Sequence, residues 1–272
     1  LGLWFDTKRG MAISLALNGA SCGGVVGVPL LVAAIGHFGF SSAVIAAAIV
    51  MVALLVPVIS LFVGHPPDRE RIGAGPSGAA AANGPSSLQI RSMAFRDVAF
   101  LTLTIAFALV LFAQVGFIVH LISFLDPVIG RERAAVAVAL LTAMAVVGRL
   151  LFSTVIDRLN QRLASALSFA SQALALVILI NSRNEIVLIA ACGLFGFSVG
   201  NLITLPALII QREFAPKSFG VLVSLLTAVT QVTYAFGPGI IGFLRDAFGG
   251  YAVPFYVCIG LELGAAVLIM VR

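Results

Sequence analysis

An arginine, Arg149, lies inside the apolar run 134–156, and its guanidinium is well suited to binding an anion. A charge at the centre of a membrane-spanning segment costs about 2.5–3.5 kcal/mol or more, so it persists where it faces protein or water. A guanidinium can hold a carboxylate through two parallel hydrogen bonds. Arg149 is therefore the leading candidate for binding a substrate anion. The alternative is that it extends to the cytoplasmic end of its helix and pairs with Asp157.

Two further titratable side chains, His120 and Glu262, lie in other apolar runs. His120 could bond the substrate or relay a proton, or it could bond a neighbouring helix and serve packing alone. Glu262 is the only carboxylate deep in an apolar run, and it is a candidate for carrying a proton. We favour the alternative that Glu262 is a structural residue, either protonated or placed at the lipid edge.

Neutral polar residues also interrupt the apolar runs. Asn201, Gln231 and Tyr234 are candidates for lining a substrate cavity. They could equally bond helix to helix, which contributes only about 0.6–2 kcal/mol for each bond. A second group of residues is predicted to govern conformational change, and its members are Asp157, Arg158, Arg162, Gly237 and Pro238.

The composition shows what kind of protein must position these side chains. The chain has 272 residues, is 61% hydrophobic and 10% charged, and has a mean hydropathy of +1.14. Soluble domains carry about 25% charged residues, so we predict an all-α integral membrane protein. The net charge of +5 does not indicate nucleic-acid binding, because basic residues of membrane proteins collect in cytoplasmic loops. The three cysteines fall in apolar runs, so no metal site, cofactor or disulfide is expected.

Eight apolar runs are each near the ~20 residues that a spanning helix needs. They cover residues 11–35, 42–63, 97–125, 134–156, 163–181, 186–210, 219–243 and 252–271. The intervening segment 65–93 is rich in Gly, Pro, Ala and Ser, which predicts a disordered linker. Lysine and arginine gather on one side if both chain ends and this linker are cytoplasmic, which is the orientation we predict.

The first and seventh runs resemble one another. Gly10 aligns with Gly220, and Pro29 aligns with Pro238, at a nearly constant offset of about 210 residues. This repeat predicts that residues 1–64 hold the last two helices of an N-terminal half, whereas 94–272 form a complete six-helix C-terminal half. The chain would then lack four helices upstream.

Three groups of residues carry a resemblance to a known family. They are Trp4-Phe5 with Lys8-Arg9-Gly10, then Gly148-Arg149 with Asp157-Arg158 and Arg162, and finally Gly237-Pro238 with Gly249-Gly250-Tyr251. At these positions the sequence resembles the major facilitator superfamily, and more narrowly its monocarboxylate-transporter and oxalate/formate-antiporter branch. Because members have twelve helices, the resemblance implies that the eight present here are helices five to twelve.

The resemblance also implies a function. In that branch the arginine at the place of Arg149 binds the substrate anion, and a histidine often stands at the place of His120. The seventh run has no lysine to supply a second cation, which favours a substrate with one carboxylate. Ala145 stands where proton-coupled members often carry an aspartate, which argues against coupling through this site.

The expected protein is thus a multi-pass secondary transporter of small organic anions, a symporter or antiporter, in a bacterial cytoplasmic membrane. It would work by alternating access, with protons as possible partners. The alternative is an inactive transporter fragment or a membrane scaffold that binds a partner. Catalysis is not expected, because the sequence has no Ser/His/Asp set and no HExxH motif.

Overall fold

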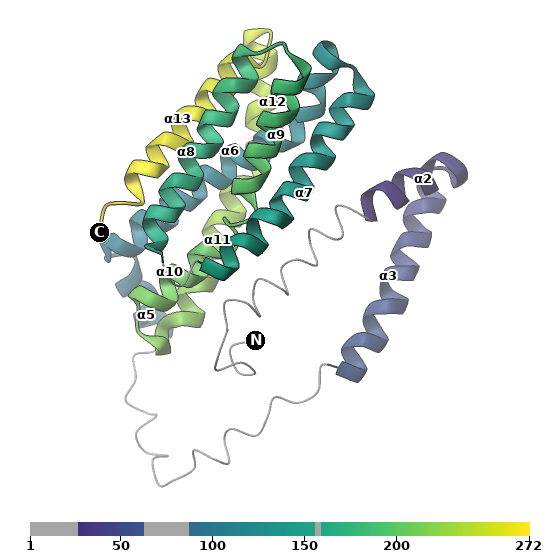
Figure 1. The fold of residues 1–272 in the computed structure, drawn as a ribbon. Coiled ribbons are helices and arrows are strands. Elements are labelled where there is room, and N and C mark those ends of the chain that lie inside the picture. Colours follow the sequence, from purple (N-terminus) through teal and green to yellow (C-terminus); the bar gives the residue numbers. More distant parts are fainter. Residues whose placement is uncertain (1–26, 63–86, 156–158) are drawn as a thin grey trace. The chain divides into compact units, whose positions relative to one another are not determined.

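The computed structural model describes residues 27–62, 87–155 and 159–272, and every regular element in these ranges is helical (Figure 1). The chain divides into two compact units, residues 1–84 and residues 85–272. We describe each unit by itself. Most of the predicted first span, 11–35, lies outside the described residues.

In the first unit, helix α2 (Val28–Phe38) is followed directly by α3 (Phe40–Phe62). Gly39 joins them with a φ of +77°, a left-handed value that favours glycine. Its backbone N–H donates to the carbonyl oxygen of Ile35, which closes the end of α2. The two helices pack against each other.

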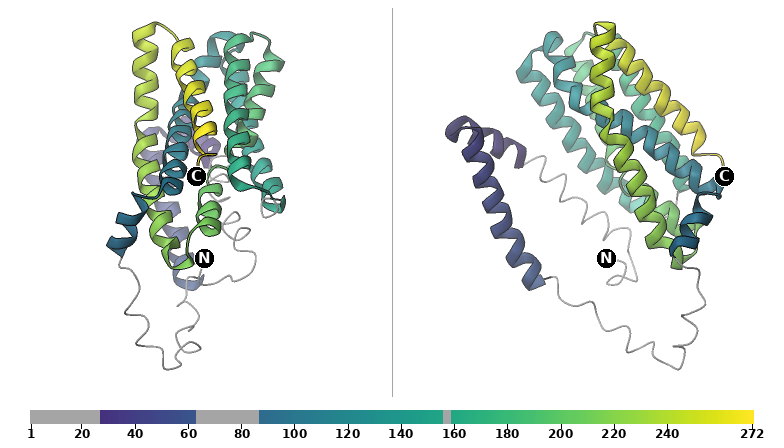
Figure 2. Two further views of the ribbon diagram at one scale, coloured as in Figure 1. Left: turned by 90° about the vertical axis from the view of Figure 1, so that its left-hand side faces the viewer. Right: turned by 180° about the vertical axis from the view of Figure 1, so that it is seen from behind.

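The second unit is a bundle of helices whose axes lie roughly parallel to one another (Figure 2). In chain order they are α5 (Ser87–Ala94), α6 (Val98–Ile129), α7 (Arg131–Val155), α8 (Gln161–Asn181), α9 (Glu185–Val199), α10 (Leu205–Glu213), the short 3-10 helix η4 (Pro216–Ser218), α11 (Phe219–Ala235), α12 (Gly237–Phe248) and α13 (Ala252–Leu268). Asp97, Asn160 and Asn184 cap the starts of α6, α8 and α9 through their side-chain oxygens.

Five segments of the described chain are helical, long and apolar enough to cross a membrane. They are Phe40–Ser60, Val98–Ile129, Arg131–Phe152, Gln161–Asn181 and Phe219–Phe248, and α9 and α13 are shorter apolar helices. The apolar composition therefore predicted the class of protein correctly, whereas the count of eight spans remains a prediction.

Three sequence expectations need correction. The run 186–210 is not one helix, because α9 ends at Val199 and α10 begins at Leu205. The run 219–243 is divided between α11 and α12 at Phe236. The last part of the expected linker is not disordered, because Ser87–Ala94 forms α5, which packs against α11.

The core of the second unit consists of two apolar clusters. The Phe117 cluster centres on Phe117, whose ring centroid lies 4.6 Å from that of Phe195 and 5.2 Å from that of Phe255. The Phe107 cluster includes Phe107 and Phe169, with centroids 5.3 Å apart. Helices α6, α8 and α13 each contribute to both clusters, so the clusters follow one another along these helices.

Candidate functional site

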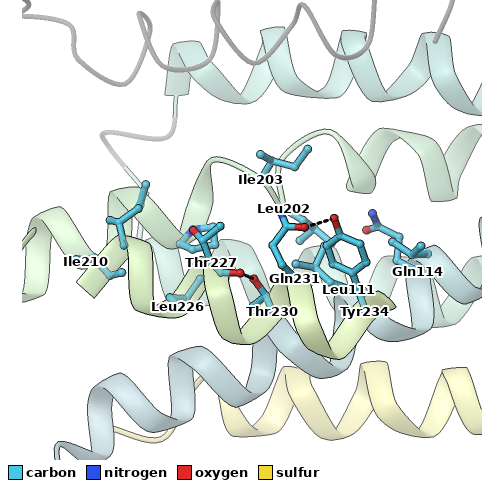
Figure 3. Close-up of a pocket in the computed structure, with 14 residues that line it drawn as sticks. Leu111, Gln114, Leu202, Ile203, Ile210, Leu226, Thr227, Thr230, Gln231 and Tyr234 are labelled. Carbon is cyan, nitrogen blue, oxygen red and sulfur yellow. Dashed lines mark hydrogen bonds between the residues drawn. The ribbon is translucent and has the colours of Figure 1, made fainter. Parts of the chain in front are cut away.

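A cavity of about 290 Å³ lies between α6, α11, α10 and the segment that joins α9 to α10 (Figure 3). Apolar side chains form most of its wall. The polar groups that line it are Gln114, Thr227, Thr230, Gln231 and Tyr234. None of the described residues that line it is charged.

Hydrogen bonds orient several of these polar groups. The Tyr234 hydroxyl donates to Oε1 of Gln231, one turn earlier on α11 (Figure 3). The hydroxyl of Thr230 donates to the carbonyl oxygen of Thr227 at 3.0 Å. Across the cavity, Gln114 on α6 accepts a bond of 3.3 Å from Nε2 of Gln172 on α8. The cavity thus combines an apolar wall with a few fixed amide and hydroxyl groups, which is typical of a small-molecule site.

Arg149 lies on α7 and is only 3% exposed. Its Nε donates to the carbonyl oxygen of Gly200 at 2.9 Å. Gly200 is the first residue of the break between α9 and α10, and Leu202 and Ile203 of the same break line the cavity. Arg149 therefore binds the backbone segment that forms one wall of the cavity and is not itself among the lining residues.

Glycines allow α7 and α9 to approach closely enough for this bond. A Cβ atom at Gly148 would collide with the carbonyl oxygen of Phe197. At Gly200 it would collide with the carbonyl oxygen of Ala145 and would lie 3.1 Å from the backbone nitrogen of Arg149. The backbone of α7 around Arg149 is therefore in direct contact with the backbone at the end of α9.

Two other predicted substrate ligands are not among the lining residues. Asn201 is 2% exposed, and its Nδ2 donates to the carbonyl oxygen of Phe197 at 3.5 Å. The ring nitrogens of His120 lie 3.2 Å from the Tyr251 hydroxyl and 3.0 Å from the carbonyl oxygen of Pro238. His120 thus ties α6 to the start of α12 and to Tyr251, the N-cap residue of α13. Gln231 and Tyr234 do line the cavity, and their contact with substrate remains a prediction.

Of the predicted conformational residues, Arg162 has the most extensive contacts. It is 2% exposed, and its Nε and Nη2 donate to both carboxylate oxygens of Glu213 at 2.8–3.1 Å. Nη1 donates to the carbonyl oxygens of Ile269 and Val271, and Nη2 donates to that of Ala99, each at 2.9 Å. Arg162 therefore links the starts of α6 and α8 to the ends of α10 and α13.

Gly237 packs the start of α12 against α6, since a Cβ there would lie 2.6 Å from the carbonyl oxygen of Phe112. The next residue, Pro238, supplies the carbonyl that His120 binds. The remaining two conformational candidates, Asp157 and Arg158, lie outside the described residues.

Glu262 is completely buried on α13. The expected alternative of a place at the lipid edge is therefore wrong. Neither of its carboxylate oxygens has a hydrogen-bond partner in the described part of the chain. Burial of an ionised carboxyl without partners costs several kcal/mol.

Three polar residues that the sequence did not single out are brought to this region by the fold. Thr227 and Thr230 line the cavity, and Gln172, which is not among the lining residues, donates a hydrogen bond to the lining residue Gln114. Gln172 could have been found, because it is a glutamine within the apolar run 163–181. The described residues contain no group of His, Cys, Asp and Glu that could hold a metal ion.

Comparison with known proteins places this fold in a family. The family model of the Major Facilitator Superfamily matches residues 1–220 and 130–272, two overlapping ranges. An MFS-type transporter of Aspergillus niger, pynF, is 27% identical over 246 residues, which cover 90% of this chain and 54% of that protein. An uncharacterized MFS-type transporter of Bacillus subtilis, YcxA, is 34% identical over 70 residues, 26% of this chain and 17% of that protein.

This chain thus spans about half the length of the first relative and a smaller part of the second. The match to the family model covers the whole chain, including both units and every helix that contributes to the cavity. Together with the apolar helices, it identifies a multi-pass integral membrane protein. The chain belongs to the Major Facilitator Superfamily.

Proposed function

We propose that this protein is a secondary active transporter of small organic anions, with monocarboxylates as the favoured class. Membership of the superfamily supports transport of a small molecule across a lipid bilayer. The observation that carries the anion assignment is Arg149, a buried cation bound to the backbone segment that forms one wall of the cavity. In this proposal the cavity belongs to one half of a path that opens alternately to the two sides, and both chain ends are cytoplasmic.

The size of the cavity suits a small solute. Drug-sized ligands occupy sites of about 300–1,000 Å³, and this cavity of about 290 Å³ lies at the lower limit. The amides of Gln114 and Gln231 and the Tyr234 hydroxyl would orient the solute, and apolar side chains would contact its hydrocarbon part. Because charges are weakly screened in a protein interior, Arg149 would favour an anion in the cavity without lining it.

Movement in alternating access would centre on places where the helices are interrupted. The break between α9 and α10 lies beside α7, and the turn at Phe236 lies beside α6. Arg162 and Glu213 would hold the cytoplasmic ends together in one conformation and release them in another, together with the predicted Asp157 and Arg158. Gly237 and Pro238 would provide the second point of bending, at the start of α12.

A second candidate function is transport of a neutral solute. The observation that favours it is the absence of charge among the described residues that line the cavity. In that case Arg149 would act only by holding the break between α9 and α10. The two candidates differ in whether a carboxylate is preferred to its uncharged amide.

Substitution of Arg149 tests the proposal. Uptake of labelled lactate into proteoliposomes should be lost in Arg149→Gln, which is close to Arg149 in length but uncharged, and partly retained in Arg149→Lys. The matched control is Arg183→Gln, an exposed arginine in the turn between α8 and α9, and it should transport as the wild type does. Lactate uptake by Arg149→Gln with an unchanged KM would contradict the anion assignment.

A further inference from the structure

The two apolar clusters of the second unit are separated by a level that carries polar side chains. On α8, Phe169 belongs to the Phe107 cluster and Ala173 belongs to the Phe117 cluster. Gln172 stands between these residues in the sequence and is completely buried. The border between the clusters on α8 therefore coincides with a glutamine.

The same border falls at polar residues on the two helices that pack against α8 and against each other, α13 and α6. On α13, Ile259 is in the Phe117 cluster and Ala265 is in the Phe107 cluster, so Glu262 lies at the border. On α6 the border falls just before Ala113, which belongs to the Phe117 cluster, and Gln114 is the next residue after Ala113. Gln114 and Gln172 are bonded to each other at the border, and Glu262 lies between the two clusters on α13.

Hydrogen bonding within this level is incomplete. Nε2 of Gln172 donates to Oε1 of Gln114, but Oε1 of Gln172 has no partner in the described part of the chain. Both oxygens of Glu262 are likewise without a partner there. An amide oxygen and a carboxylate can only accept hydrogen bonds, whereas a protonated carboxyl can also donate one. One proton on Glu262 would supply the donor that these atoms lack.

We propose that Glu262 is a proton-binding site, and that its protonation sets, through Gln172 and Gln114, which hydrogen-bonding group is presented to the cavity. This inference rests on the proposed transport of organic anions. The proton would come from water on one side of the membrane, bind an oxygen lone pair of Glu262, and return to water on the other side. No other bond forms or breaks.

The direction of the hydrogen bonds explains the coupling. When Glu262 is protonated, its O–H donates to Oε1 of Gln172, Gln172 donates to Gln114 as observed, and the amide N–H of Gln114 is free to donate to an anion. When Glu262 is ionised, Gln172 must turn its NH₂ group toward the carboxylate. Gln114 then turns as well and presents its oxygen, which repels an anion. Binding of the proton and of the anion therefore favour each other.

Other titratable groups on the helices around Glu262 are engaged elsewhere or lie near helix ends. On α6 they are Asp97, His120 and Asp126, on α8 Arg162, on α12 Arg245 and Asp246, and on α13 itself Tyr256 and Cys258. Arg162 binds the carbonyl of Ile269, about 10 Å along α13 from Glu262. His120 binds Tyr251, which lies about 16 Å from Glu262 along the axis of α13, in the direction of the N-terminus of that helix. Cys258, one turn from Glu262, is directed toward the carbonyl of Ala113.

The test compares the wild-type protein with Glu262→Gln, each reconstituted into proteoliposomes. The probe is labelled lactate. With acid outside, the wild type should accumulate lactate above equilibrium. Glu262→Gln cannot exchange a proton, so it should lose this accumulation and retain the exchange of internal for external lactate. Accumulation by Glu262→Gln equal to that of the wild type would overturn the proposal.

Gln172→Leu removes the link to Gln114 and should also lose accumulation. The matched control is Gln161→Leu, which removes a buried glutamine of the same helix whose Oε1 also lacks a partner in the described structure. Gln161 lies at the start of α8, away from the level of Glu262, so its variant should accumulate lactate normally. Loss of accumulation in both variants alike would overturn the link through Gln172.

Infrared spectroscopy of the purified proteins separates failure of this inference from failure of the proposed function. The wild type at neutral pH should show the carbonyl stretch of a protonated carboxylic acid, and Glu262→Gln should lack it. If lactate is not transported, the proposed function fails, and this band still decides whether Glu262 holds a proton. Absence of such a difference between the two proteins would overturn the proposal.

Discussion

Two buried arginines in the described part of the bundle stand in contrasting places. Arg162 lies where helix ends meet, and it binds a carboxylate and three backbone carbonyls from other segments. Arg149 lies within a long helix, and its Nε binds the backbone at a break beside the cavity. Arg162 therefore links helix ends, whereas Arg149 holds the break that forms one wall of the cavity, and its action on a ligand remains a prediction.

Removal of Arg162 should have the largest effect. Arg162→Met removes the hydrogen bonds to the Glu213 carboxylate and to three carbonyl groups. Breaking a buried ion pair costs about 3–5 kcal/mol, and the lower end applies because Glu213 is 21% exposed. The free energy of unfolding, measured in detergent with increasing denaturant, should fall by about 3 kcal/mol.

The double variant Arg162→Met with Glu213→Leu sharpens this result. The double variant also removes the Glu213 carboxylate that has lost its partner Arg162, so it should recover part of the lost stability. If Arg162→Met is as stable as the wild type, Arg162 is not a structural link between the helix ends.

A methyl group at Gly200 should have an intermediate effect, because it would displace the segment to which Arg149 binds. Its Cβ would collide with the carbonyl of Ala145, so Gly200→Ala must move α9 away from α7. Overpacking of this kind costs about 1–3 kcal/mol, and displacement of the break should also raise the KM for lactate. Thermal unfolding and uptake measured on the same preparation test both expectations.

The control for Gly200→Ala is Gly264→Ala. Gly264 lies within α13, and no atom of another helix lies within 4 Å of where its Cβ would stand. Its replacement should leave uptake unchanged and stabilise the protein by about 0.5–1 kcal/mol. Equal effects of the two substitutions would show that the contact between α7 and α9 is not specific.

The effect at His120, which resembles Arg162 in linking helices, should be confined to stability. His120→Phe loses its bonds to Tyr251 and to the Pro238 carbonyl, at a cost of about 0.5–1.5 kcal/mol each. Because His120 does not line the cavity, the KM for lactate should not change. A clear rise of KM without loss of stability would instead favour the predicted role of His120 in binding substrate.

Hydropathy predicted the helical membrane class, and apolar runs located helices such as α6 and α8 within a few residues. It could not locate the break between α9 and α10, because Leu202, Ile203 and Leu205 keep the run apolar where the helix stops. Hydropathy reports burial in the membrane and does not report continuity of backbone hydrogen bonds. The turn at Phe236 was missed for the same reason.

The candidate site was predictable in part. Polar residues in apolar runs pointed to Gln231 and Tyr234, which the structure places in the cavity wall. The sequence did not reveal that Arg149 binds the carbonyl of Gly200, since this contact depends on how closely α7 and α9 approach. Nor could it place Glu262, because burial depends on which face of α13 meets α6 and α8.

The most direct test of anion transport is a comparison of labelled lactate with lactamide, its uncharged amide, for uptake into proteoliposomes that contain the protein. We predict that the wild type transports lactate in strong preference to lactamide, and that Arg149→Gln abolishes this preference. Equal uptake of the two solutes by the wild type would contradict anion transport and would favour the neutral solute that the uncharged cavity wall suggests.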